Sequence, residues 1–472
     1  MSRQFPRSFR GVIGFRKAWP ICLFNFDILL LLFATTTAYM WVAIWNGYPT
    51  FYPDSSTYIG SGFQLDTPVD RPITYGLFIW LASAGGLSLW PTLFFQTLLL
   101  VLALREFTAL FISKGHYLVL LITNVITGVS FLSSQVMTDL FTSIMLLSML
   151  LFMFAGHRNN WWLGVFVVCC AMHTSHLLLA AACLPFLATA RWMSGASTLA
   201  KALKRCLPLA VAIGVAYIPI NISVVKSGEA FYAAHLADTG DLQEYLERSC
   251  DEHRYIICDM GPIEQNAEIF LWHPDGIAQH YPSRDAMKKE LGSIISSMVH
   301  DPISSRRIVR STMKYWYQQL SHYTIGEGNV PFDNDSDLYN RVRTYFDEEH
   351  HCFERMQQND PFVFDALTGY LNVKYKAVIL ISVMILTLAC MVLAALGDRL
   401  FIACTFFLFM GYLLNCLVNA GLVVVANRFG AKLIWLLPLL AIIGAVMLVR
   451  RLSTRKQAEL SDTSARPANF AR

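Results

Sequence analysis

The chain has 472 residues, of which 55% are hydrophobic and only 15% are charged. A soluble domain normally has about a quarter of its residues charged, so this composition excludes an ordinary soluble protein and indicates that a bilayer is the main solvent. The formal net charge of +4 is too small to indicate a nucleic-acid-binding protein.

The charges are unevenly distributed along the chain. Residues 226–372 hold 24 of the 33 acidic residues but only 13 of the 37 basic residues. Cytoplasmic loops of membrane proteins carry an excess of Lys and Arg, so this acidic segment is expected outside the cytoplasm. The basic segments at 3–17 and 450–456 are expected inside it, which places both termini in the cytoplasm.

Ten apolar segments predict about ten transmembrane helices. The first, at 21–45, is too long for a signal-peptide core and should remain as a helix. Basic residues at both ends of 161–190 favour a hairpin that turns at His173 over a single long helix. The nine later segments are 90–111, 117–131, 139–155, 161–173, 175–190, 207–224, 377–396, 401–426 and 433–449.

The expected organisation has four parts, which are an N-terminal transmembrane module (1–226), an extracytoplasmic domain (227–371), C-terminal transmembrane helices (372–450) and a cytoplasmic tail (451–472). Helical periodicity at 242–248 and 286–299 predicts that the extracytoplasmic domain is mainly α-helical.

Two cysteines of the expected extracytoplasmic domain suggest a disulfide. Cys250 and Cys258 lie eight residues apart, and an oxidising compartment favours a bond between them. Cys352 is a further candidate for pairing.

The first extracytoplasmic loop contains Asp54, Tyr58, Asp70 and Arg71 and leads into a short apolar helix expected at 73–84. A carboxylate just outside a first transmembrane helix can deprotonate an acceptor hydroxyl, and a cation can hold a leaving phosphate. Two alternatives stay open. Asp54 can be only a turn or helix cap, and Arg71 can be an interfacial side chain that reaches toward water.

Four more polar residues are expected at the same membrane face. Asp139 opens an apolar segment, so it can be a helix cap or a functional carboxylate near membrane depth. Arg428 can clamp a phosphate or reach toward the interface. His173 and His176 have no acidic or cysteine partner at ligand spacing, so we expect them to line a cavity and not to bind a metal.

Taken in order, these motifs resemble those of the GT-C glycosyltransferases. A first helix, a loop Asp and then Arg71-Pro72 before a short apolar helix resemble most closely the bacterial lipid A aminoarabinose and galacturonic acid transferases and the protein mannosyltransferases. Met137-Thr138-Asp139 is similar to the family's second acidic position. Arg428-Phe429 with Pro438 is similar to its late Arg-Tyr…Pro signature.

The chain also departs from the family pattern. The first loop has one Asp in a Pro-Asp-Ser context instead of an adjacent acidic pair, and Phe429 stands in place of the usual Tyr. The segment 227–371 matches no soluble module of the family. Because the adjacent acidic pair is missing, the need for a divalent cation stays open. No other cofactor is implied.

The resemblance implies a GT-C-like helical fold and inverting transfer of a sugar from a polyprenyl-phosphate donor to an extracytoplasmic lipid, glycan or protein. Asp54 would be the base, Asp139 would position the acceptor, and Arg71 and Arg428 would hold the donor phosphate. The expected partners are donor, acceptor and membrane lipids. The expected setting is a bacterial inner membrane with the site facing the periplasm. The cell envelope and its lipopolysaccharide are the expected context, but the resemblance does not give the sugar or the acceptor.

Two other classes of protein stay open. An O-antigen polymerase or ligase would rely on arginine and histidine in its large outer loop. A lipid or solute transporter would show charged or interrupted helices near the bilayer midplane.

Overall fold

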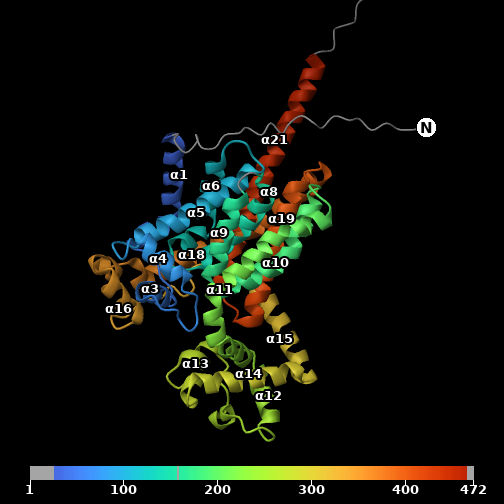
Figure 1. The fold of residues 1–472 in the computed structure, drawn as a ribbon. Coiled ribbons are helices and arrows are strands. Elements are labelled where there is room, and N and C mark those ends of the chain that lie inside the picture. The colour runs from blue at the N-terminus through green and yellow to red at the C-terminus, as the bar shows by residue number, and fades with distance from the viewer. Residues whose placement is uncertain (1–25, 157–158, 465–472) are drawn as a thin grey trace, which may run out of the picture.

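The computed structural model describes residues 26–156 and 159–464, and this part of the chain is helical. Its one β-type pairing is an isolated parallel bridge between Thr50 and Gln135. The helices form a bundle with a smaller helical unit at one end, as Figure 1 shows. The expected helical membrane architecture is confirmed, while the basic segment at 3–17 lies outside the described residues.

Six helical stretches in the described part of the chain are long and apolar enough to cross a membrane, by length and composition. A span needs about 20 apolar residues. The chain is therefore a helical membrane protein. The six are α5 (Trp90–Ala109), α10 (Thr174–Met193), the first part of α11 (Leu199–Asp238), α18 (Pro361–Ala395), α19 (Arg399–Leu422) and the pair α20 (Asn427–Ile434) and α21 (Leu436–Ser464).

The other four expected segments form shorter apolar helices of 10–17 residues. They are α1 (Phe26–Tyr39), α6 (His116–Ile126), α8 (Asp139–Phe154) and α9 (Asn159–Met172). Neighbouring helices bury almost every side chain of α8. Crossing of the membrane by these four helices stays a prediction, and so does the total of ten spans.

The stretch at 161–190 forms two helices, as its flanking charges indicate. His173, between α9 and α10, has an extended backbone with φ −153° and ψ 143°. Its side chain accepts a hydrogen bond from the backbone N–H of Ser175 and so caps α10. The two helices contact each other.

The bundle has two distinct ends (Figure 1). At the terminal end, α1 begins and α21 ends. The opposite end, here called the insert end, carries α3 (Ser55–Gln64), α4 (Thr74–Ala82), α12 (Asp241–Ser249), α13 (Ala267–Trp272), α14 (Arg284–His300) and α16 (Asp337–Tyr345). The short α17 (His350–Glu354) contacts α16. The helices expected at 73–84, 242–248 and 286–299 are α4, α12 and α14. The short α2 (Trp41–Asn46) follows α1, and α7 (Val129–Ser134) precedes α8.

The expected part boundaries differ from the structure, because three helices run through them. The boundary at 226/227 lies inside α11, which continues to Asp238, the boundary at 371/372 lies inside α18, and the boundary at 450/451 lies inside α21. The segment 227–371 also has two cores. Side chains between Ala230 and Met298 form a core of their own, whereas Val342 and Phe353 belong to the core of the bundle.

Local sequence signals explain where two further helices begin. α15 (Pro302–Gln319) starts after Asp301, and α18 starts after Asp360. Each Asp side chain accepts hydrogen bonds from two backbone N–H groups of the first turn, and Pro follows as the first helical residue.

Helices α12, α13 and α14, with the separate core between Ala230 and Met298, are here called the α12–α14 unit. Within this unit a disulfide joins Cys250 to Cys258, whose Cα atoms are 5.9 Å apart. Cys352 is a free cysteine in α17 and lies with the bundle.

Candidate functional site

The first loop is held beside the start of α8 by backbone pairing. The Thr50 N–H donates to the Ser134 carbonyl and the Val136 N–H donates to the Thr50 carbonyl, each at 2.9 Å. The Ser55 hydroxyl donates to the Val136 carbonyl at 2.8 Å. These bonds bring the segment that contains Asp54 next to the segment that ends at Asp139.

Two glycines let α3 and α4 approach closely. A Cβ atom on Gly62 would lie 2.1 Å from the Gly76 carbonyl oxygen, and one on Gly76 would lie 2.6 Å from the Tyr58 carbonyl oxygen. Larger residues would separate the helices. Because Asp54 precedes α3 and Arg71 precedes α4, this crossing helps to keep the two side chains together.

Asp54 lies between two guanidinium groups. Its Oδ1 accepts a hydrogen bond from Arg71 Nη2 at 2.7 Å, and its Oδ2 accepts one from Arg428 Nη1 at 3.2 Å. Asp54 holds the N-cap position of α3, but its side chain accepts no cap hydrogen bond among the described residues. The interpretation of Asp54 as only a helix cap is therefore wrong.

Burial raises the pKa of the Asp54 carboxyl, but Arg71 and Arg428 outweigh burial and hold that pKa below its ordinary value. Arg71 also forms an ion pair with Asp70, Nε to Oδ2 at 3.0 Å, and its guanidinium lies 5.4 Å from the Tyr58 ring centroid. The structure thus brings together the four residues predicted from the first loop.

Arg428 and Lys432 lie one turn apart in α20, so their side chains share a face. Both reach the Asp139 carboxylate. Lys432 Nζ is 3.0 Å from Asp139 Oδ1, and Arg428 Nε is 3.9 Å from Asp139 Oδ2. Asp139 is the first residue of α8, and Thr138 holds the N-cap position. We call Asp54, Arg71, Asp139, Arg428 and Lys432 the charged cluster.

The two histidines have different surroundings. His176 Nε2 lies 2.8 Å from the Thr142 hydroxyl and Nδ1 lies 2.7 Å from the Cys169 carbonyl oxygen, so this ring ties α8, α9 and α10 together. His173 interacts electrostatically with Lys432, Arg71 and Arg428 and therefore adjoins the charged cluster.

The residues of the charged cluster do not fit a divalent cation. Each of its carboxylates already pairs with Arg or Lys. No group of three or more His, Cys, Asp or Glu side chains in the described part of the chain is arranged to hold a metal ion.

The loop between α15 and α16 contacts Arg428 of the charged cluster and the neighbouring Tyr52. Glu327 accepts hydrogen bonds from Asn427 Nδ2 at 3.1 Å and from the Arg428 backbone N–H at 2.9 Å. Gly328, with φ +76°, lies so close to Tyr52 that a Cβ atom would meet its ring at 1.8 Å. The Tyr52 ring centroid lies 4.2 Å from the Arg428 guanidinium carbon.

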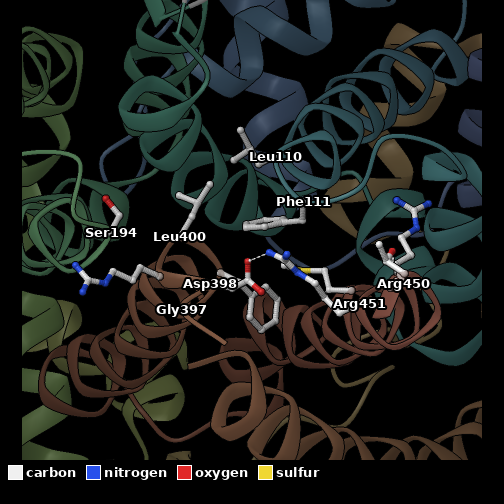
Figure 2. A pocket seen from close by; sticks show the side chains of 12 residues that line it. Leu110, Phe111, Ser194, Gly397, Asp398, Leu400, Arg450 and Arg451 are labelled. Atoms are coloured by element: carbon white, nitrogen blue, oxygen red, sulfur yellow. Dashed lines mark hydrogen bonds and ion pairs between the residues drawn. The ribbon is translucent and has the colours of Figure 1, made fainter. Parts of the chain in front are cut away.

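Two cavities in the described part of the chain, of about 520 and 610 Å³, lie at the terminal end and not beside Asp54. The first is shown in Figure 2. There Asp398, from the turn between α18 and α19, forms an ion pair with Arg451 of α21 at 2.7 Å, next to Phe111.

Sequence reasoning missed Lys432, Tyr52 and Glu327. The four-residue spacing from Arg428 is a signal that could have indicated Lys432. No local signal indicates Glu327, because its partners lie about 100 residues later in the chain.

Comparison of the chain with family models, curated proteins and solved structures finds no match. The charged cluster is therefore the basis for a functional proposal.

Proposed function

We propose that the chain is an integral membrane glycosyltransferase that moves a sugar from a polyprenyl-phosphate donor to an extracytoplasmic acceptor. One observation carries the proposal. Asp54 is held between Arg71 and Arg428 at one end of a membrane bundle. Transfer from a lipid phosphate needs such a pairing of a base with cations for the phosphate. The insert end would face the periplasm of a bacterial inner membrane.

In the resting state Asp54 is ionised but weakly basic, because two guanidinium groups neutralise it. A donor phosphate competes for the same guanidinium groups. As they turn toward the phosphate, Asp54 loses its counter-charges and its pKa rises, which makes it a stronger base when the donor is bound.

The proposed step is a single displacement. Asp54 accepts the proton of the acceptor hydroxyl while the hydroxyl oxygen forms a bond to the anomeric carbon of the sugar. The bond from that carbon to the phosphate oxygen breaks, and the lipid phosphate leaves with the electron pair.

Arg428 has hydrogen-bonding capacity for the departing phosphate. Its Nε is buried without a hydrogen-bond partner among the described residues, and it lies 3.9 Å from Asp139. A phosphate oxygen would satisfy this donor, and guanidinium suits phosphate because its N–H groups form a fixed fork. Lys432 pairs more closely with Asp139, so we assign Asp139 a positioning role.

The experiment compares Asp54→Asn with Asp66→Asn, the same chemical change at an exposed residue of the same loop. Purified variants in liposomes receive labelled polyprenyl-phosphate sugars, and label is followed into lipid, glycan and protein fractions. Loss of a general base lowers the rate of sugar transfer by about 10²–10⁴. The Asp66→Asn variant should transfer sugar at the wild-type rate.

Correct folding of the Asp54→Asn variant is checked by size-exclusion chromatography and by donor binding. A folded, donor-binding Asp54→Asn protein that transfers sugar at the wild-type rate would exclude Asp54 as the base and remove the main support for the proposal.

A second candidate, a lipid or solute transporter, is favoured by two observations. Asp139 and Lys432 are nearly fully buried in apolar helices, and the chain is interrupted between α19 and α20. Buried charge pairs and interrupted helices are typical of transport sites. For a transporter, Asp139→Asn would abolish movement of a substrate across the vesicle membrane. The wild-type protein would then form no labelled covalent product.

A further inference from the structure

The second cavity at the terminal end has a strongly basic lining. It measures about 610 Å³ and lies between the ends of α8 and α9 and the loop that joins α10 to α11. Four of its lining residues are cations, and the described lining contains no carboxylate. The lining residues are Phe152, Asn160, Leu163, Arg191, Ser197, Lys201, Lys204, Arg205 and Pro208.

Two buried polar atoms of this lining have no hydrogen-bond partner among the residues that the structure describes. Arg191 Nη1 donates to the Met153 carbonyl at 2.8 Å, which fixes the side chain, but its Nε has no hydrogen-bond partner among the described residues. The Ser197 hydroxyl is also buried and unpartnered there. A buried donor without a partner costs free energy, so an acceptor oxygen that a ligand brings to either group would be stabilising.

The surroundings of the cavity are those of a membrane interface. Trp161 and Trp192, at the ends of α9 and α10, are exposed, and tryptophan is enriched at the level of the headgroups. Leu203 and Leu207 are exposed on α11 next to the basic residues and continue toward the apolar span. A ligand held here would therefore have both water and lipid beside it.

We propose that this cavity binds the phosphate headgroup of an anionic membrane lipid. Arg191 and Ser197 donate to the phosphate oxygens, and Lys201, Lys204 and Arg205 supply the charge. Basic pockets between transmembrane helices are suited to such headgroups. The acyl chains lie along the exposed apolar face of α11. This site lies at the end of the bundle opposite the charged cluster and does not depend on the proposed glycosyltransferase activity.

The experiment uses the full-length protein in a neutral detergent. Native mass spectrometry measures retained lipid, and thermal unfolding is followed after addition of phosphatidylglycerol, phosphatidylcholine or inorganic phosphate. We expect the wild-type protein to retain phosphatidylglycerol and to be stabilised by it more than by the other two. Each removed cation should weaken retention roughly fivefold.

The test variant combines Lys201→Gln, Lys204→Gln and Arg205→Gln. The matched control removes three exposed cations from the α12–α14 unit through Arg254→Gln, Arg284→Gln and Lys289→Gln. Ser197→Ala removes an unpartnered hydroxyl without changing charge, so it tests the site even if the triple variant does not fold.

Three results would overturn the proposal. The triple variant could retain as much phosphatidylglycerol as its control does. Ser197→Ala could bind the lipid as tightly as the wild-type protein. Inorganic phosphate could stabilise the protein as much as phosphatidylglycerol does, which would assign the cavity to a soluble phosphate ligand.

Discussion

The ammonium group of Lys432 lies 3.0 Å from the carboxylate of Asp139, and both side chains are nearly fully buried. Removing two charges from water costs several kcal/mol for each ion, so each needs the other as its counter-charge. The pair joins α20 to the start of α8 and keeps Arg428 on the same face beside Asp54.

The first prediction concerns this pair. Asp139→Asn should lower the free energy of unfolding by about 3–5 kcal/mol, because the Lys432 charge stays buried without its partner. Lys432→Met should lower it by less, because Arg428 Nε still lies 3.9 Å from the Asp139 carboxylate. The double variant should recover much of this loss. Unfolding in mixed detergent micelles measures all four proteins. If the double variant loses the sum of the two single losses, the pair is not coupled.

The second prediction concerns pH. Arg71 and Arg428 hold the pKa of Asp54 below its ordinary value of 3.8. Their ion pairs therefore contribute stability above that value, and the contribution is lost as pH falls through the lowered pKa. The difference in melting temperature between the wild-type protein and Asp54→Asn should be constant from pH 7 to about pH 4 and shrink below it. A difference that already shrinks between about pH 7 and pH 5 would contradict the lowered pKa.

The third prediction concerns the disulfide in the α12–α14 unit. Replacing Cys250 and Cys258 by Ser should lower the stability of this unit by roughly 2–3 kcal/mol, because the bond closes a short loop in the unfolded chain. The unit has its own core, so donor binding at the charged cluster should not change. Limited proteolysis measures the loss of stability in the α12–α14 unit. Equal protease resistance of the wild-type protein and the double Ser variant would argue against a stabilising role for the disulfide.

The fourth prediction concerns which side of the membrane each end faces. A cysteine introduced at the exposed residue Asp335 should react with a membrane-impermeant reagent added outside intact cells. A cysteine at the exposed residue Ser453, in the part of α21 at the terminal end, should react only after the cells are opened. Cys352 is replaced by Ser in both proteins. Labelling of the two sites in the opposite order would invert the proposed orientation.

Much of the fold follows from local patterns, because apolar length and flanking charge are properties of short segments. The break at His173 could be predicted for this reason. The boundary at 226/227 could not, since the apolar pattern ends there while α11 continues as a polar helix. Asp54 and Arg71 lie in the same loop, so their closeness can be predicted from the sequence. The contact of Asp54 with Arg428 depends on how distant helices pack, and the order of residues in the sequence does not give that packing.

The last prediction separates charge from geometry at Arg428. Arg428→Ala should weaken binding of a polyprenyl-phosphate sugar about 10- to 100-fold, the effect of losing hydrogen bonds to a charged group. Arg428→Lys keeps the charge but loses the guanidinium fork, so it should recover only part of the affinity.

Arg343→Ala, at an exposed arginine of α16, is the matched control for Arg428→Ala and should bind the donor as the wild-type protein does. Fluorescence titration with a labelled donor gives the dissociation constants. If Arg428→Ala binds the donor as tightly as the control, Arg428 does not hold the phosphate. Its ion pair with Asp54 would then be structural, and the competition that raises the basicity of Asp54 would have to come from Arg71.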